Sequence, residues 1–158
     1  MKQILLPLLG VALFIVAVGI FTNKIQNQKV NLSAKKEIKV GSINVAIEVA
    51  DSEEERKMGL SGRKSLGEND GMLFKFDKND VFPSFWMKDM LIPIDIVWIN
   101  DGKIAKIHKN VQPQPGKKDS ELTLYSPDLP IDYVLEVNTG FSDKNGLKVE
   151  DRVDLSGI

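Results

Sequence analysis

Short segments with strand character recur along the chain from residue 37 to its end, and turn residues separate each segment from the next. Segments rich in Val, Ile and aromatic residues, bounded by Gly, Pro, Asn or Asp, are typical of β-strands. They lie at 37–40, 43–49, 72–76, 84–88, 94–99, 103–109, 133–138 and 151–155. Because strands do not alternate regularly with long helices, the sequence predicts a mainly β fold: a compact, barrel-like domain of short strands with one or two short helices.

Turn and cap signals place the hairpins and helices of this domain. Residues 41–42 and 100–102 separate strand segments as in hairpins, and each contains a glycine that supplies the positive φ such turns require. Ser52, or the aspartate before it, can cap a helix with an acidic first turn, and Gly59 is placed to end that helix. A second short helix or turn is expected after 139–140.

A long apolar run, residues 4–21, carries no charge. Its length suits a transmembrane helix, whereas the apolar core of a signal peptide is usually about 7–15 residues long. No Ala-x-Ala cleavage site follows, so we expect an anchor at 1–22, a polar linker at 23–36 and a β-rich domain at 37–158. The expected location is the cell membrane, with a single pass and the domain outside the cytoplasm. Cleavage remains an alternative, as does the opposite orientation, because lysines follow the run.

Composition excludes several classes of function. The formal net charge is −1, so the basic surface of a nucleic-acid-binding protein is not expected. The chain has no cysteine, which rules out disulfides, thiolate metal sites and a thiol nucleophile. A single histidine, His108, cannot form a multi-histidine zinc site, and its alternation with Lys106 predicts a solvated position. We therefore expect neither a metal nor another cofactor.

Five distinctive strings follow one another between residues 38 and 155. They are Glu55-Arg56-x-x-Gly59-Leu60-x-x-Arg63-x-x-Leu66, Gly71-Met72-Leu73-Phe74-x-Phe76, Phe85-Trp86-Met87-Lys88 continuing to Ile92-Pro93-Ile94-Asp95-Ile96, Tyr133-Val134-Leu135-Glu136, and Gly146-Leu147-x-Val149-x-Asp151-x-Val153. In this order they resemble domain-of-unknown-function family 192, an uncharacterised membrane-protein family. The resemblance implies a small β-barrel-like domain with short helices, often exported or membrane-anchored, and it implies no established reaction.

The sequence departs from the pattern of this family at three places. Ser61 stands where a methionine is usual. The pair 89–90, Asp-Met, replaces Asn-Thr and could alter a binding surface. Glu150 replaces a common glycine, which would strain the turn before Asp151, a residue expected to accept hydrogen bonds from backbone amides there.

Five residues are candidates for ligand binding: Arg63, Trp86, Lys88, Asp95 and Glu136. On a strand, Trp86 and Lys88 share one face, where they would form a recognition patch for a ligand. Core packing, with the lysine reaching out to water, is the alternative. Arg56 and Arg63 could together form a fork for a carboxylate or phosphate group, and an ordinary solvated surface is the alternative.

Two of these candidates, Asp95 and Glu136, are carboxylates among apolar neighbours. A buried carboxylate needs a partner, so Asp95 is either a functional group with a perturbed pKa or a structural partner. In the structural reading, Asp95 would pair with Lys88, Arg56 or Arg63, or cap the loop amides near Pro93. Glu136 faces opposite to Tyr133 and would pair with a basic residue or join Asp95 in a polar cluster.

These residues support two main hypotheses of function. The first is a membrane-anchored extracytoplasmic domain that serves as a binding or accessory module of the cell envelope, with a glycan, a peptide or an envelope protein as ligand. The alternative is a hydrolase or transferase with Asp95 and Glu136 as acid and base and Lys88 stabilising negative charge. A purely structural role is the third reading, and a large exposed apolar patch would be its marker.

Overall fold

The structure, a computed structural model, describes residues 35–158. The anchor predicted at 1–22 and nearly all of the linker predicted at 23–36 lie outside these described residues. Within residues 35–158, none of the helices has the length and apolar character needed to cross a membrane.

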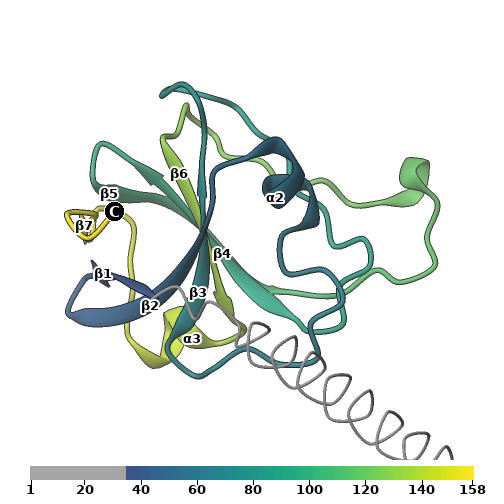
Figure 1. The fold of residues 1–158 in the computed structure, drawn as a ribbon, viewed down its shortest axis with the longest axis horizontal. Helices are drawn as coiled ribbons and strands as arrows, with labels where there is room; N and C mark the ends of the chain where they lie inside the picture. Colours follow the sequence, from purple (N-terminus) through teal and green to yellow (C-terminus); the bar gives the residue numbers. More distant parts are fainter. Residues whose placement is uncertain (1–34) are drawn as a thin grey trace, which may run out of the picture. The chain divides into compact units, whose positions relative to one another are not determined.

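Within the described residues the chain forms seven strands, two short α-helices and one 3-10 helix (Figure 1). In chain order these elements are β1 (Lys36–Val40), β2 (Ile43–Ala50), α2 (Glu53–Met58), β3 (Asp70–Lys75), β4 (Ile94–Asn100), β5 (Lys103–Val111), η1 (Asp119–Glu121), β6 (Tyr133–Asn138), α3 (Phe141–Lys144) and β7 (Val153–Asp154). The two short helices and all but one of the predicted strands are present, with bounds shifted by a few residues.

The seven strands form one sheet in the order β5-β4-β6-β3-β2-β1-β7. Its two ends approach each other, because Lys103 at the start of β5 pairs with Arg152 next to β7. The amide of Val153 also donates to the carbonyl of Gly102 at 2.8 Å. The sheet is therefore a nearly closed barrel, which confirms the predicted mainly β, barrel-like fold and removes most of the exposed strand edges.

Both predicted hairpins are present. Val40 pairs with Ile43, and Asn100 pairs with Lys103, so each loop has two residues. Asp101 and its following glycine have φ values of 48° and 66°, the paired positive angles of the tight turn that matches strand twist. One connection differs from expectation, since β2 and β3 pair in parallel and α2 lies in the crossover between them.

The strand predicted at 84–88 is not formed. Only Phe85 makes a β-bridge, with Tyr125, and the carbonyl of Met87 accepts from the amide of Gln114 at 3.1 Å. This segment lies across the outer face of the sheet, where its backbone groups find isolated partners in the long 112–132 connection. An apolar run with strand composition thus serves as a covering loop.

The domain has an apolar core on each face of its central strands. One core takes residues from all seven strands and fills the barrel; Val97 and Leu135 belong to it. The second lies on the outer face of β3, β4 and β6, beneath α2 and the segments that follow β3 and β5; Phe74 and Trp98 belong to it. Because both faces of these central strands are covered, β4 reads as a continuous apolar run interrupted only by Asp95.

Candidate functional site: a pocket over a buried carboxyl group

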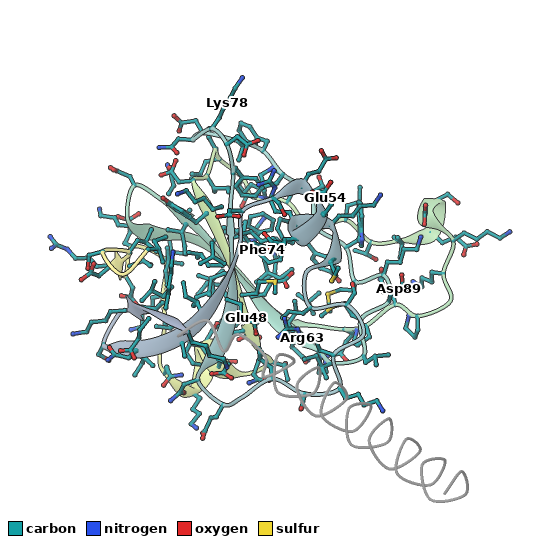
Figure 2. The ribbon with its side chains drawn as sticks, viewed as in Figure 1. Glu48, Glu54, Arg63, Phe74, Lys78 and Asp89 are labelled. Atoms are coloured by element: carbon teal, nitrogen blue, oxygen red, sulfur yellow. The ribbon has the colours of Figure 1, made fainter. Side chains whose placement is uncertain are left out.

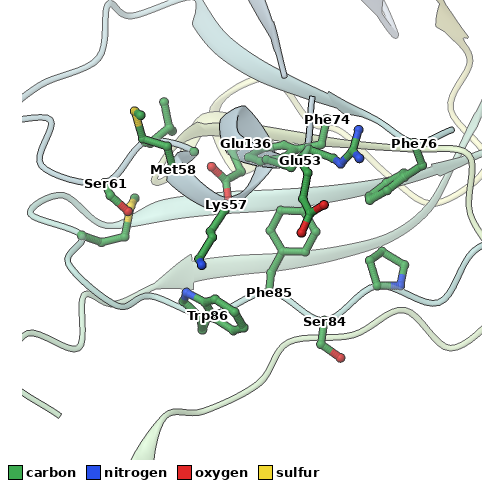
Figure 3. A pocket seen from close by; sticks show the side chains of 15 residues that line it. Glu53, Lys57, Met58, Ser61, Phe74, Phe76, Ser84, Phe85, Trp86 and Glu136 are labelled. Carbon is green, nitrogen blue, oxygen red and sulfur yellow. The ribbon is translucent and has the colours of Figure 1, made fainter. Parts of the chain in front are cut away.

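A cavity of about 380 Å³ opens between α2 and the 83–90 segment, above β3 and β6 (Figure 3). Its walls are mostly aromatic and apolar. They include the aromatic side chains of Phe74, Phe76, Phe85 and Trp86 and the thioether of Met90. Such a volume, with a lining that combines apolar and polar side chains, is typical of a site for a small ligand or a single side chain.

Glu136, on β6, is the buried polar group of this pocket. Its side chain points into the cavity (Figure 3), and only 5% of the residue is exposed. Its Oε2 atom has no hydrogen-bond partner among residues 35–158. Burial penalises the charged form and raises the pKa of Glu136 to about 8. The carboxyl group is therefore mostly protonated at neutral pH, and it presents an O–H donor and an acceptor to the pocket.

A chain of edge-to-face aromatic contacts holds the pocket wall next to Trp86 in place. Phe74 meets Phe85 with ring centroids 4.8 Å apart, and Phe85 meets Trp98 at 5.5 Å. The backbone of Phe85 also exchanges two hydrogen bonds with Tyr125, at 2.9 and 2.8 Å. These contacts hold the neighbouring Trp86 at the mouth of the pocket, where 46% of the residue remains exposed.

The opposite wall is α2, whose ends are fixed by local sequence. The hydroxyl of Ser52 accepts from the amide of Glu55 at 3.2 Å, and the Glu55 carboxylate accepts from the amide of Ser52 at 3.1 Å, which together form a capping box. Arg56 ties the helix to the sheet, since its guanidinium donates to the carbonyls of Asp51 and Lys75 at 2.6 and 2.9 Å. The guanidinium of Arg56 is thus already engaged.

Gly59 brings the chain directly over the carboxyl group at the end of α2. Its φ and ψ of 51° and −135° belong to a region essentially restricted to glycine. A Cβ atom there would lie 3.3 Å from the Phe74 ring and 3.9 Å from Oε2 of Glu136. The glycine therefore allows the turn that closes one side of the pocket.

The structure places two of the five predicted site residues, Trp86 and Glu136, in this pocket. Lys88 lies outside it and pairs with Asp119 of η1 at 2.6 Å. Trp86 and Lys88 consequently do not form one strand face, because the segment that carries them is not a strand.

Arg63 also lies outside the pocket, in the loop after α2. Its guanidinium forms a bidentate ion pair with the carboxylate of Glu48 on β2, with both N···O distances at 2.6 Å (Figure 2). This contact lowers the pKa of Glu48 and raises that of Arg63. Arg63 therefore binds a carboxylate, as predicted, but that carboxylate is internal and Arg56 does not share it.

Asp95 is fully buried and has a structural partner set. Its carboxylate accepts hydrogen bonds from the amides of Asn110 at 2.9 Å, Gly140 at 3.2 Å and Ser142 at 2.9 Å. It therefore caps the first turn of α3 and joins it to the end of β5. The sequence-based alternative that Asp95 accepts hydrogen bonds from backbone amides is confirmed, but these amides belong to α3, its cap and β5, not to the loop near Pro93.

The proposed acid–base pair of Asp95 and Glu136 is wrong. In the antiparallel ladder of β4 and β6, Asp95 lies opposite Val137, and Glu136 lies opposite Ile96. Because opposed residues share a face and successive residues alternate, the two carboxyl groups point to opposite faces of the sheet. Asp95 belongs to the barrel interior and Glu136 to the outer pocket, so they cannot act on one substrate.

The predicted solvated position of His108 is also wrong. His108 faces the outer core, where its Nδ1 atom accepts a hydrogen bond from Nε1 of Trp98 at 2.8 Å and its ring meets Tyr125 edge-on. Burial, with a smaller effect of the Lys106 charge, lowers the pKa of His108. The 112–132 connection covers this face of β5, which strand alternation alone does not reveal.

Sequence reasoning missed most of the pocket wall. The charge pattern of the first helix predicts a solvated face for Lys57, and strand composition predicts only strands for Phe74 and Phe85. These three side chains line the pocket that contains Glu136. Among residues 35–158, no three His, Cys, Asp or Glu side chains are grouped to hold a metal ion.

A family model named DUF192 and described as "Uncharacterized ACR" matches residues 35–155. The chain belongs to the DUF192 family. A crystal structure described as a "putative transcription regulator" from Sinorhizobium meliloti 1021 is similar, with a TM-score of 0.70 and 29% identity over 79% of this chain and 96% of that one. A protein of unknown function from Novosphingobium aromaticivorans DSM 12444 has a TM-score of 0.66 and 28% identity over 75% and 83%. A search of curated proteins gives no match.

These similarities bear on the pocket in two ways. Four of the five strings that resemble the DUF192 family contribute to its lining, through Gly59, Phe74, Trp86 and Glu136 among others. One of the positions at which the sequence departs from the family pattern also belongs to the pocket, because Met90 forms part of its wall. The similarity to the Sinorhizobium protein spans 96% of that chain, so the similar fold makes up nearly all of it.

Proposed function

We propose that this DUF192 domain is a binding module whose pocket takes a small organic ligand or a single side chain of a larger partner. The observation that carries the proposal is the carboxyl group of Glu136, which lies buried at the pocket floor with an unpartnered oxygen. A buried polar group without a partner lowers the stability of a fold, so its presence in a cavity supports a role in ligand recognition.

The cost of this residue supports the proposal. With a pKa of about 8 in the folded chain against an ordinary value of 4.5, Glu136 destabilises the fold by about 3 kcal/mol at pH 7. An apolar residue would fill the same volume among Phe74, Leu60 and Met90 without this loss. Sites that serve function often keep such a cost, whereas purely structural positions do not need it.

Binding is favoured over catalysis by the other polar groups of the pocket. The hydroxyl of Ser84 contacts that of Ser126 at 2.9 Å, and that of Ser61 donates to the carbonyl of Lys88 at 3.4 Å. Within residues 35–158, neither hydroxyl is hydrogen-bonded to a histidine or a carboxylate that could act as a base. Nucleophilic catalysis needs such an activated pair. Around the mouth, the exposed apolar side chains of Met58 and Trp86 extend the contact surface available to a ligand.

We further propose that the module works at the cell envelope, with residues 1–22 anchoring it in the membrane and the domain outside the cytoplasm. The uncharged run at 4–21 supports this location. Partners would then be a peptide, a glycan or an envelope protein, and the net charge of −1 argues against nucleic acid. Protease added to intact cells should degrade the domain; protection until the membrane is opened would refute this orientation.

Ligand screening of residues 35–158 tests the binding role. A fragment collection is screened by thermal shift and the hits are repeated on Trp86→Ala, which removes part of the pocket, and on Lys88→Ala, which lies outside it. We expect hits that stabilise the unmodified domain and Lys88→Ala equally and lose affinity at least tenfold for Trp86→Ala. A screen without hits, or hits that bind Trp86→Ala unchanged, would overturn the proposal.

A further inference from the structure

We propose that the ligand of this pocket is an organic cation, an ammonium group carried on an aromatic or other apolar body. This inference rests on the proposed binding function and specifies the chemical class of the ligand. It stands on the combination of a buried, unpartnered carboxyl group with aromatic walls in one cavity.

Within residues 35–158, no cationic side chain pairs with this carboxyl group. Arg56 lines the pocket, but its guanidinium is held by two backbone carbonyls and lies 5.9 Å from the centre of the Phe76 ring. Lys57, also on α2, lines the pocket with an exposed side chain and forms no ion pair within residues 35–158. A cationic ligand would provide the missing partner, and a charge-assisted hydrogen bond in such an environment is about twice as strong as a neutral one.

The walls suit the rest of such a ligand. Phe74, Phe85 and Trp86 surround the space in front of Glu136, and aromatic faces attract cations by their quadrupole, with tryptophan the strongest. An apolar body on the ammonium group would replace water against these rings. A small hydrated ion would gain much less from these walls, which is why we infer an organic cation.

The charged groups around Glu136 do not oppose this assignment. On α2, the negative charge of Glu53 lies near the positive charges of Arg56 and Lys57 at the mouth, and the 83–86 part of the facing wall carries no charge. His108 lies on the same sheet face, but Ile96 separates it from Glu136 because the three residues occupy neighbouring strands. Burial is accordingly the cause of the raised pKa of Glu136.

Binding of a cation would require Glu136 to lose its proton, which gives the inference a measurable sign. With a pKa of about 8, roughly 0.9 proton should leave the protein per ligand bound at pH 7. For the same reason affinity should rise about fiftyfold between pH 6 and pH 8. A neutral ligand that accepts the carboxylic O–H would instead bind more weakly at higher pH.

Three probes with one skeleton separate these possibilities: 2-phenylethylammonium, 2-phenylethanol and 3-phenylpropionate. Their binding to residues 35–158 is measured by calorimetry at pH 6, 7 and 8, in buffers of different ionisation enthalpy to count protons. We expect the ammonium probe to bind at least tenfold more tightly than the alcohol at pH 8, and the anion to bind most weakly. Glu136→Gln should remove this preference and its pH dependence, while Trp86→Ala should weaken all three probes and keep the pH dependence.

Equal binding of alcohol and ammonium, or an ammonium preference that survives in Glu136→Gln, would overturn the cation assignment. Absence of binding by all three probes would overturn it as well. In each case the fragment screen described above decides separately whether the pocket binds ligands at all, so failure of the assignment and failure of the proposed function are distinguishable. If Glu136→Gln does not fold, the proton count and pH dependence of the unmodified domain still decide the outcome.

Discussion

Replacing Glu136 by glutamine keeps the size of the side chain but removes its titration. In the folded domain burial raises the pKa of Glu136 from an ordinary 4.5 to about 8. Between these two values the folded state holds a proton that the unfolded state has lost. Stability must therefore fall as pH rises through this window, and the loss levels off above pH 8. Below pH 4.5 the carboxyl group is protonated in both states and causes no loss.

The magnitude of this effect is large for one residue. From the two pKa values, the penalty grows from about 1 kcal/mol at pH 5 to about 5 kcal/mol at pH 9. Relative to Glu136→Gln, the unmodified domain should thus lose about 4 kcal/mol of unfolding free energy across this range. For a domain of this size that corresponds to more than about 10 °C in melting temperature.

Urea unfolding of residues 35–158 and of Glu136→Gln at pH 5, 7 and 9 provides the assay. The other titrating groups, including the Glu48–Arg63 pair, are common to both proteins and cancel in the difference. Stability curves that stay parallel, within about 1 kcal/mol from pH 5 to pH 9, would refute the assignment of Glu136 as a buried group with a raised pKa. A gap that widens with pH, in favour of the glutamine variant, supports it.

Three further predictions concern residues outside the pocket. Arg63→Ala should lower the unfolding free energy by about 1 kcal/mol, because its contact with Glu48 is only partly buried, and should leave the affinity of pocket ligands unchanged in calorimetry; a large loss of affinity would show that the loop contributes to the site. Glu150→Gly should raise the melting temperature, because Glu150 adopts a φ of 75°, which glycine adopts without strain. The strain energy removed, about 1 kcal/mol, exceeds the stabilisation from the exposed ion pair of Glu150 with Lys103. A lower melting temperature would contradict this ranking. His108 is the sole histidine of the chain, so its signal in an NMR titration needs no assignment. The titration should give a pKa of His108 below 6.5, because the ring is partly buried beneath the 112–132 connection. A value at or above 6.5 would argue against this burial.

Local sequence determined the elements of the domain because their causes are local. Ser52 and Glu55, within one turn of each other, form the capping box of α2, and the glycine after Asp101 supplies the turn of the β4–β5 hairpin. The strain expected where Glu150 replaces a glycine is also a local property, and the structure gives it a positive φ. Asp151 accepts from the amide of Lys148 at 2.8 Å, as its turn position predicts.

The partners of the buried and half-buried charged groups were decided by tertiary structure. Asp95 finds amides near residues 110 and 140–142, and Arg63 finds Glu48 on β2, and neither pairing leaves a signal in the spacing of the sequence. The same holds for His108, whose burial depends on a connection that folds back over β5. Composition indicates that these charges need partners, but only the folded chain brings the partners within hydrogen-bond distance.

The pocket shows the same division. The sequence alone established that Glu136 lies on a strand, faces opposite to Tyr133 and stands among apolar residues, because strand alternation is set by local geometry. Which residues cover its face was decided by the long-range packing of α2 and the 83–90 segment onto β3 and β6. That packing left Glu136 without a hydrogen-bond partner among residues 35–158. It also separated Glu136 from Asp95 by the thickness of the sheet, since one residue along a strand reverses the direction of the side chain.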